Sequence, residues 1–365
     1  MIKKTDVLVS IVINNPIDRV SRPIRVAQWA AGRIGRSAMR AVIRDPSLEL
    51  VALHVHSPEK VGRDAGEVCG LEPIGLRATS EISDVLLSQP DVLLYMPEGY
   101  DLDALETILS AGVNVITTRS EFFFPKGMKP EIRERIQRAC ETGGSSLFAT
   151  GSSPGFSTVA LPLVLTNLSR KVDCITIDEF ADIPASVTPS MITDVMGFGS
   201  PPASSLNQRR LDHVSEGFSQ SLQTLATTLG KSIDRFETRG EMALARESIT
   251  LANGHVIEPG TMAAQRITVS AIKEDRIILE FRANWYCSKN LDRDWYLGDS
   301  GWRIQIQSDT PLDVKIEFPR GPQSHADQMS SLTAHPAVNA IPHVLKAEPG
   351  IRINPELATM SPWLA

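Results

Sequence analysis

The chain divides into two parts that differ in the spacing of their apolar residues. Between residues 25 and 150, short apolar runs alternate with segments whose apolar residues recur at helical spacing. The runs cover residues 25–30, 48–53, 91–95, 113–117 and 146–150. Apolar strands that alternate with amphipathic helices are typical of a parallel sheet covered on both faces. We therefore predict a Rossmann-type, doubly wound α/β sheet for this part.

The second part shows strict alternation instead. Apolar and polar residues alternate with a period of two at residues 173–180, 264–270, 276–285 and 302–306. Such strands have one wet face, which indicates a mostly antiparallel sheet in an α+β domain. Between these strands, residues 191–202 are rich in Gly, Pro and Ser and predict a loop, and residues 203–230 predict one or two helices.

A chain of 365 residues exceeds the usual size of one hydrophobic core, so we expect two domains. The pattern of apolar residues changes at residues 151–156, and we place the domain boundary there. We predict a leader of uncertain order at residues 1–21, a dinucleotide-binding domain at 22–150 and a substrate-binding domain at 151–330. An apolar segment within residues 331–365 predicts a C-terminal helix that packs back on the first domain.

A turn of small residues follows the first predicted strand. Gly32 and Gly35 take the second and third glycine positions of the dinucleotide fingerprint, while Ala30 takes the first. An Ala is compatible with that position if its φ is negative. A helix N-terminus behind such a loop offers backbone N–H groups to a pyrophosphate, although simple packing also explains a tight turn. The predicted phosphate loop consists of Ala31, Gly32, Arg33, Ile34 and Gly35.

The end of the second predicted strand bears on the choice of cofactor. NAD sites usually carry a carboxylate there for the ribose 2′-hydroxyl, but residues 54–58 contain no acid. Arg33, His56 and Ser57, with Lys60 or Arg63, are suited to hold a 2′-phosphate. We therefore predict NADP as the cofactor, with NAD also possible.

Ligands of parallel sheets bind beyond the carboxyl ends of the strands. Met96, Pro97 and Thr117 fall at such ends and are expected near the nicotinamide. Glu121 follows the same strand end as Thr117 and precedes an apolar stretch, so its carboxylate is a candidate for acid–base chemistry in a dry pocket. A surface Glu, or one at the start of a helix, is the alternative interpretation.

Composition narrows the class of partners. The chain is 42% apolar and 22% charged, with a net charge of −6, which gives no reason to expect a nucleic-acid or acidic-membrane partner. Its four cysteines lack the spacing of a zinc site, so no metal is expected. No apolar run is long enough to span a bilayer, and we expect a cytoplasmic protein.

Five short motifs occur in a specific order, at residues 29–35, 57–66, 114–118 with Glu121, 153–156 and 338–342. In them the chain resembles the 2,4-diaminopentanoate dehydrogenase and native amine dehydrogenase family, which looks like a branch of the dihydrodipicolinate reductase-type proteins. The resemblance covers about residues 24 to 352. Two departures are Ala30 in place of Gly and the missing acid after the second strand. The second departure argues against strict use of NAD.

The resemblance implies reductive amination of small ketones or aldehydes with ammonia by NAD(P)H, and oxidative deamination in reverse. It implies that Glu121 is the acidic catalytic residue, that residues 30–35 hold phosphate and that Asn339 lies near the nicotinamide. It also implies a homodimer joined through the sheet of the second domain.

Side chains of the second part complete the predicted site. Phe156, Asp178, Phe180, Trp285 and Cys287 are candidates for the substrate pocket, although such residues more often belong to a core or an interface.

Two other functions stay open. One is an NAD(P)H-dependent reductase of another C=N or C=O metabolite, and the other is a dinucleotide-sensing protein without catalysis. Dihydrodipicolinate reductase activity itself is not expected, because the His-His pair and the Pro-Ser-Gly-Thr loop shared by those enzymes are missing.

Overall fold

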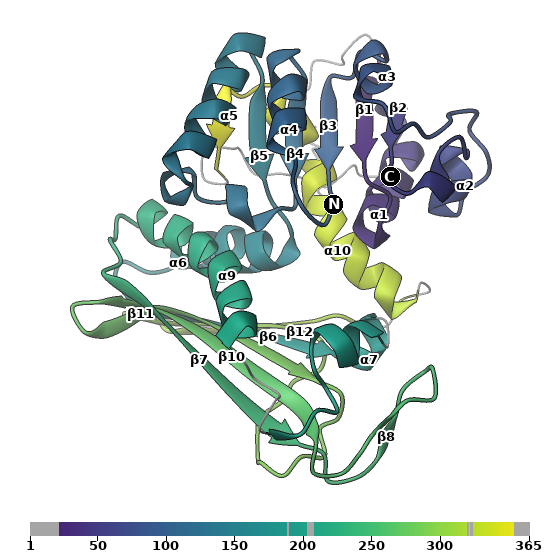
Figure 1. Ribbon diagram of the computed structural model, residues 1–365. Helices are drawn as coiled ribbons and strands as arrows, with labels where there is room; N and C mark the ends of the chain where they lie inside the picture. Colours follow the sequence, from purple (N-terminus) through teal and green to yellow (C-terminus); the bar gives the residue numbers. More distant parts are fainter. Residues whose placement is uncertain (1–21, 188–189, 203–207, 320, 322–323, 354–365) are drawn as a thin grey trace, which may run out of the picture.

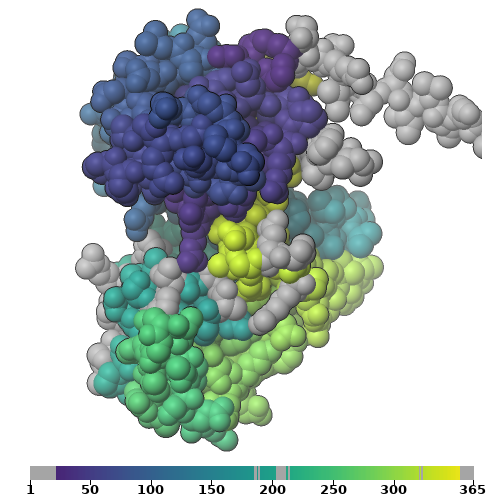
Figure 2. All heavy atoms as spheres, turned by 90° about the vertical axis from the view of Figure 1, so that its right-hand side faces the viewer, coloured from purple at the N-terminus to yellow at the C-terminus, as the bar shows by residue number. Residues whose placement is uncertain are grey.

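The chain forms two bodies, each built on a six-stranded sheet, with the C-terminal helix between them (Figure 1). The structure is a computed structural model and describes residues 22–187, 190–202, 208–319, 321 and 324–353. From the side, the early residues form the upper body, and yellow C-terminal residues lie between part of it and the green lower body (Figure 2).

The upper sheet is parallel throughout, with the strand order β14-β5-β4-β3-β1-β2. Its strands are β1 (Ile24–Trp29), β2 (Leu48–His54), β3 (Val92–Tyr95), β4 (Asn114–Thr117), β5 (Ser146–Ala149) and β14 (Gly350–Arg352). The Rossmann-type prediction is confirmed, and β14 is an addition that the sequence pattern did not reveal. The strand order reverses between β1 and β3, and parallel sheets of this kind bind ligands in a crevice beyond the carboxyl ends of the strands at such a point.

Helices bury both faces of this sheet, which explains why its strands are almost wholly apolar. One face packs against α1 (Arg33–Arg44), α2 (Ala65–Cys69), α10 (His325–Asn339) and α11 (Ile341–Val344). The other face packs against α3 (Ile82–Leu87), α4 (Leu102–Ser110) and α5 (Pro130–Gly143). Successive strand residues point to opposite faces, so Val26 enters the first core and Ala27 the second.

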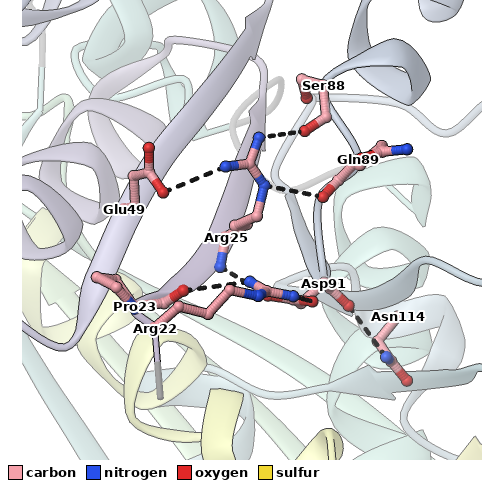
Figure 3. Close-up of polar contacts among 8 residues, drawn as sticks. All are labelled: Arg22, Pro23, Arg25, Glu49, Ser88, Gln89, Asp91 and Asn114. Atoms are coloured by element: carbon pink, nitrogen blue, oxygen red, sulfur yellow. Dashed lines mark hydrogen bonds and ion pairs between the residues drawn. The ribbon is translucent and has the colours of Figure 1, made fainter. Parts of the chain in front are cut away.

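Ion pairs and hydrogen bonds join the strands at their amino ends, on the edge opposite to the crevice (Figure 3). The Asp91 carboxylate accepts two bonds of 2.8 Å from Arg22 and one of 2.8 Å from the Arg25 amide. Its backbone carbonyl accepts from the Asn114 side chain at 3.0 Å. Burial alone would raise the pKa of Asp91, but the bonds from Arg22 and Arg25 lower it. This cluster holds β1, β3 and β4 in register, away from the candidate site.

The lower sheet has the order β13-β12-β6-β11-β10-β7, and all its pairs are antiparallel except β6 with β11. Its strands are β6 (Val172–Asp182), β7 (Arg235–Leu244), β10 (Met262–Lys273), β11 (Arg276–Tyr286), β12 (Gly301–Ser308) and β13 (Leu312–Glu317). β8 (Ile249–Thr250) and β9 (Val256–Ile257) form a small hairpin. The predicted mostly antiparallel sheet is confirmed.

The two faces of the lower sheet differ in chemistry. Ile175 and Ile177 of β6 pack with Phe218 and Leu222 of α9 (Gln208–Thr228), on the face toward the upper body. We call this the inner face; α6 (Leu161–Thr166) also covers it. Because side chains alternate along a strand, Asp178 points to the opposite, outer face.

Two predicted segments differ from the structure. The helix expected within residues 331–365 is α10, which spans His325–Asn339 and is followed by α11 (Ile341–Val344) and then by β14. Pro342 lies in the first turn of α11, where its missing N–H is tolerated, and it cannot continue the backbone bonding of α10. The loop predicted at residues 191–202 begins with a helical turn, η5 (Met191–Val195). Residues 1–21 and 354–365 lie outside the described residues, and the predicted domain limits stay predictions. No helix in the described ranges is both long and apolar enough to cross a membrane.

Candidate active site

The turn after β1 contains a residue in the left-handed region of backbone conformation. Ala30 adopts a φ of 74°, so the condition of a negative φ, under which an Ala is compatible with this position, is not met. The turn is held in this conformation by Gln28, whose buried amide donates to the Trp29 carbonyl at 3.1 Å and the Ala30 carbonyl at 3.0 Å. A Cβ atom on Gly35 would overlap with the same Ala30 carbonyl oxygen. Only glycine therefore lets α1 approach the end of β1 this closely.

Gly32 has a different role from Gly35. It is the N-cap of α1, receives no side-chain cap and has an exposed backbone. A Cβ atom placed there would meet no atom within 4 Å among the described residues. The first turn of α1 holds no acidic residue. Backbone donors thus face open space in front of a helix N-terminus, and this arrangement fits a phosphate group.

Two histidines and Lys60 lie at the end of β2, where Glu59 is also present. The Lys60 ammonium, on η1 (Pro58–Lys60), lies 3.4 Å from the Ala31 carbonyl oxygen, so it reaches across to the phosphate loop. The exposed His56 ring accepts a bond of 3.2 Å from the Trp29 indole. His54 is buried against Trp29, with ring centroids 3.5 Å apart, and burial lowers its pKa. Of the predicted 2′-phosphate residues, His56 and Ser57 lie here, while the exposed Arg33 begins α1.

Arg119 connects the carboxyl ends of β3 and β4. Its guanidinium donates to the backbone carbonyl of Glu98, which follows β3, and to the carboxylate of Glu121, which follows β4. Its amide donates to the Thr117 hydroxyl at 3.1 Å. Met96, at the start of the same β3 loop, donates its amide to the Trp29 carbonyl at 3.1 Å. The predicted residues Met96, Pro97 and Thr117 therefore lie at one edge of the sheet.

Glu121 lies on the short helical turn η2 (Ser120–Phe122). One of its carboxylate oxygens, Oε1, pairs with Arg119, whereas Oε2 is buried and has no hydrogen-bond partner among the described residues. The side chain is 28% exposed, so the surroundings are less dry than the sequence suggested. Glu121 therefore offers a free acceptor at the edge of the sheet.

Helix α9 of the lower body binds the backbone of the turn that carries Glu121. The Gln220 amide, oriented to satisfy its bonding, donates to the carbonyls of Ser120 at 3.1 Å and Glu121 at 3.3 Å. The Thr224 hydroxyl donates to the Phe123 carbonyl at 3.0 Å. The position of Glu121 thus depends on both bodies.

Of the five predicted pocket residues, two lie elsewhere. Asp178 and Phe180 point to the outer face, because β6 places alternate residues on opposite sides. Asp178 pairs there with Arg282 at 2.9 Å, and Phe180 packs on Tyr296 with ring centroids 5.7 Å apart. The pocket prediction for these two residues is not supported by their orientation.

The remaining candidates lie in different parts of the molecule. Phe156 follows β5 on the helical segment η4 (Ser152–Ala160), is 39% exposed and has its ring 5.9 Å from that of Trp302. Trp285 shares the inner face with Ile175 and Ile177. Cys287 follows β11, and burial raises the pKa of its thiol. Asn339 ends α10, next to Ala340, which is buried in the upper core.

Sequence reasoning missed three contributors to this region: Arg119, Gln220 and Glu179. Glu179 lies on the inner face, where it accepts bonds from two tryptophans. A signal existed for Glu179, because it shares odd numbering with Ile175 and Ile177 in an alternating strand. No comparable signal existed for Gln220, since its contact joins segments about a hundred residues apart.

The chain matches two protein families along its length. Residues 26–141 match the family described as dihydrodipicolinate reductase, N-terminus. Residues 159–364, more than half of the chain, match the 2,4-diaminopentanoate dehydrogenase C-terminal domain. The chain belongs to the 2,4-diaminopentanoate dehydrogenase family. The sequence prediction of an oxidoreductase that acts on amines is confirmed at the level of this family.

Relatives of this family member agree with the assignment. It is 28% identical over 343 residues to an amine dehydrogenase of Streptomyces virginiae, which covers 90% of this chain and 94% of that protein. A 4-hydroxy-tetrahydrodipicolinate reductase of Methylococcus capsulatus is 36% identical over 156 residues, or 42% of this chain and 52% of that protein. The fold matches an amine dehydrogenase from Mycobacterium smegmatis with a TM-score of 0.74 and 18% identity, over 94% and 98% of the two chains.

The two glycines of the phosphate loop allow a paired test in this dehydrogenase. Gly35→Ala should lower the free energy of unfolding by about 1–3 kcal/mol, because its methyl group overlaps with the Ala30 carbonyl. Gly32→Ala should change it by less than about 0.5 kcal/mol, yet weaken NADPH binding about tenfold or more by filling the open space. Urea unfolding and fluorescence titration with NADPH measure these effects. Unchanged NADPH affinity in Gly32→Ala would remove this loop from the cofactor site.

Proposed function

We propose that the chain is an NAD(P)-dependent amine dehydrogenase. It joins ammonia to small ketones or aldehydes by reductive amination and catalyses the reverse oxidative deamination. The observation that carries this proposal is the Glu121 carboxylate, which keeps one buried oxygen unpaired among the described residues at the crevice edge of the sheet. Membership of a dehydrogenase family named for a diamine supports the reaction class.

The cofactor proposal rests on the loop after β1. The backbone N–H groups of residues 31–35 would hold the pyrophosphate, since Gly32 leaves the space in front of α1 open. Met96, Pro97, Thr117 and Asn339 would flank the nicotinamide end. When bound, a nicotinamide dinucleotide supplies the hydride acceptor for the oxidative direction and the hydride donor for the reductive one.

NADP is favoured over NAD because of charge at the end of β2. No acid occurs at residues 54–58 to repel a 2′-phosphate, and Lys60 lies against the phosphate loop. His56 accepts from the Trp29 indole through Nε2, so in the neutral ring Nδ1 carries the proton and can donate to a phosphate oxygen. The exposed Arg33 adds a second positive charge.

The chemical role of Glu121 follows from its free oxygen. In the oxidative direction, Oε2 accepts an N–H of the substrate ammonium and takes one proton, which leaves a neutral amine. Loss of hydride from the carbon then produces a positively charged iminium, while Glu121 holds the proton that it took from the ammonium. Water adds to the iminium carbon and loses one proton to solvent, and the proton held by Glu121 returns to the nitrogen. Ammonia then leaves as the C–N bond breaks, and the hydroxyl group loses its proton to give the carbonyl. The reductive direction reverses each step.

Arg119 positions Glu121 for this role. It binds Oε1, so the second oxygen is the one left for the substrate. Its bond to the Glu98 carbonyl anchors the pair to the end of the neighbouring strand. A carboxylate with one fixed oxygen and one free oxygen loses little conformational freedom when the substrate binds.

Replacement of Glu121 tests the proposal directly. In Glu121→Gln we expect kcat to fall about a hundredfold or more, because the proton acceptor is lost, while the dissociation constant of NADPH stays nearly unchanged. Initial rates of NADPH consumption with a panel of ketones and ammonia measure this. Glu98→Gln is the matched control, since Glu98 uses only its backbone carbonyl and its side chain is exposed.

Three outcomes would contradict the amine chemistry. An unchanged rate in Glu121→Gln would remove this residue from the site. Consumption of NADPH that does not need ammonia would favour a reductase of another C=N or C=O compound. Tight NADPH binding without turnover of any compound tested would favour a dinucleotide sensor.

A second variant tests the preference for NADP. Lys60→Met should raise the KM for NADPH about tenfold, because a charge-assisted contact to the 2′-phosphate is lost, and leave the KM for NADH unchanged. Steady-state kinetics with both cofactors check this. An equal rise for both cofactors would mean that Lys60 acts on the shared pyrophosphate or on the loop itself. The homodimer and the cytoplasmic location remain predictions.

A further inference from the structure

The side chain of Trp29 lies at the carboxyl end of β1, where residues of both neighbouring strands pack on it. In the register of the sheet it is opposite His54 of β2 and Tyr95 of β3. The His54 ring stacks on the indole with centroids 3.5 Å apart and planes 11° apart, and the Tyr95 ring lies at 5.7 Å. All three side chains are buried. Packing therefore fixes the orientation of the indole.

The ring of His54 is held in one protonation state. Its Nε2 atom lies 3.0 Å from the carbonyl oxygen of Ser80, which can only accept, so Nε2 carries the proton. Burial lowers the pKa of His54, which keeps the ring neutral at about pH 7. Its Nδ1 atom has no hydrogen-bond partner among the described residues. A neutral ring, bonded to the backbone, thus supports the stacked indole.

The indole N–H of Trp29 determines which nitrogen of His56 carries a proton. It donates to Nε2 of the exposed His56 ring at 3.2 Å. A nitrogen that accepts carries no proton, so in the neutral ring the proton lies on Nδ1. A neutral imidazole without such a neighbour can carry its proton on either nitrogen. Trp29 therefore makes Nδ1 a donor and leaves it for a ligand.

The two nicotinamide dinucleotides differ in what they require from this ring. The 2′-phosphate of NADP offers only acceptor oxygens, so it binds a protonated Nδ1 and is repelled by the lone pair of an unprotonated one. The ribose 2′-hydroxyl of NAD both donates and accepts, so it can bond to either form. The tautomer of His56 therefore matters for NADP and much less for NAD.

We propose that Trp29 is a positioning residue for cofactor selection, which favours NADP by holding His56 as the tautomer with its proton on Nδ1. The inference rests on the proposed function, in which His56 lies at the 2′-phosphate. Lys60 and Arg33 contribute charge to that site, whereas Trp29 is neutral and acts through His56. Selection of NADP then depends on a buried indole as well as on the basic groups around the phosphate.

Nitrogen NMR of the protein without cofactor tests the tautomer itself. The spectrum is recorded with ¹⁵N-labelled histidine at about pH 8.5, where an ordinary histidine is neutral, and His56 is assigned from the signals missing in His56→Asn. We expect a protonated Nδ1 and an unprotonated Nε2 in the wild type. In Trp29→Phe, which keeps a ring but removes the N–H, both nitrogens should share the proton. A wild-type His56 protonated on Nε2 would overturn the proposal, because Nε2 could not then accept from the indole.

Dissociation constants of NADPH and NADH at the same pH test the effect on selection. In Trp29→Phe the Kd of NADPH should rise about threefold to tenfold, while the Kd of NADH should change less than about twofold. Trp295→Phe is the matched control in the lower body, where the Trp295 ring packs on the Arg266 guanidinium, and it should keep both wild-type values. An equal rise for both cofactors in Trp29→Phe would refute the proposal, because it would show a general disturbance of the site.

Two further proteins separate the lost N–H from lost packing. A benzothiophene ring in place of the Trp29 indole removes only the N–H and keeps the size of the side chain, so it should reproduce the effect on NADPH. In His56→Asn the amide supplies N–H donors without help from the indole, so adding Trp29→Phe to this variant should leave the ratio of the two Kd values unchanged. A further fall in that ratio would mean that Trp29 acts on the loop and not through His56.

Failure of this inference differs from failure of the proposed cofactor preference. If the wild type binds NADPH no more tightly than NADH, the preference for NADP fails, and the role of Trp29 fails with it. If the wild type prefers NADPH and Trp29→Phe keeps the whole preference, only the role of Trp29 is refuted. The ¹⁵N spectrum needs no cofactor, so it tests the contact between Trp29 and His56 in either case.

Discussion

The contact between Arg119 and Glu121 is the constraint on which the candidate site depends. It joins the ends of β3 and β4, since the same guanidinium also binds the Glu98 carbonyl. Through it, one carboxylate oxygen is fixed and the other is left without a partner among the described residues. Gln220 of α9 supports the turn from the lower body. The position of Glu121 therefore depends on both bodies. Together these contacts leave one oxygen of the Glu121 carboxylate without a partner among the described residues.

Alternation along β6 decides what the lower sheet contributes. A shift of one residue would exchange Glu179 for Asp178 on the inner face and expose the apolar residues Ile175 and Ile177. Packing of these isoleucines against α9 therefore fixes the register and, with it, the identity of the inner carboxylate. The cost of exposing these apolar residues thus determines which acid lies on the inner face.

Much of the fold was predictable from sequence because the patterns are local. Five apolar runs gave the parallel sheet, and period-two alternation gave most of the lower one. The site was predictable only in part: the position of Glu121 after β4 follows from the strand pattern, but its partner Arg119 does not. Ala30 shows another limit, since its φ of 74° is set by the approach of α1 at Gly35 and by the Gln28 amide. The contact of Gln220 with the Glu121 turn was not predictable either, because it joins segments about a hundred residues apart.

The most direct measurement of the central claim is a crystal structure of the protein with NADP⁺ and a bound amine. The account requires the amine nitrogen to lie within about 3.2 Å of Glu121 Oε2, with Oε1 still paired to Arg119 and the phosphates at residues 31–35. An amine held elsewhere, with Glu121 turned to solvent, would contradict it.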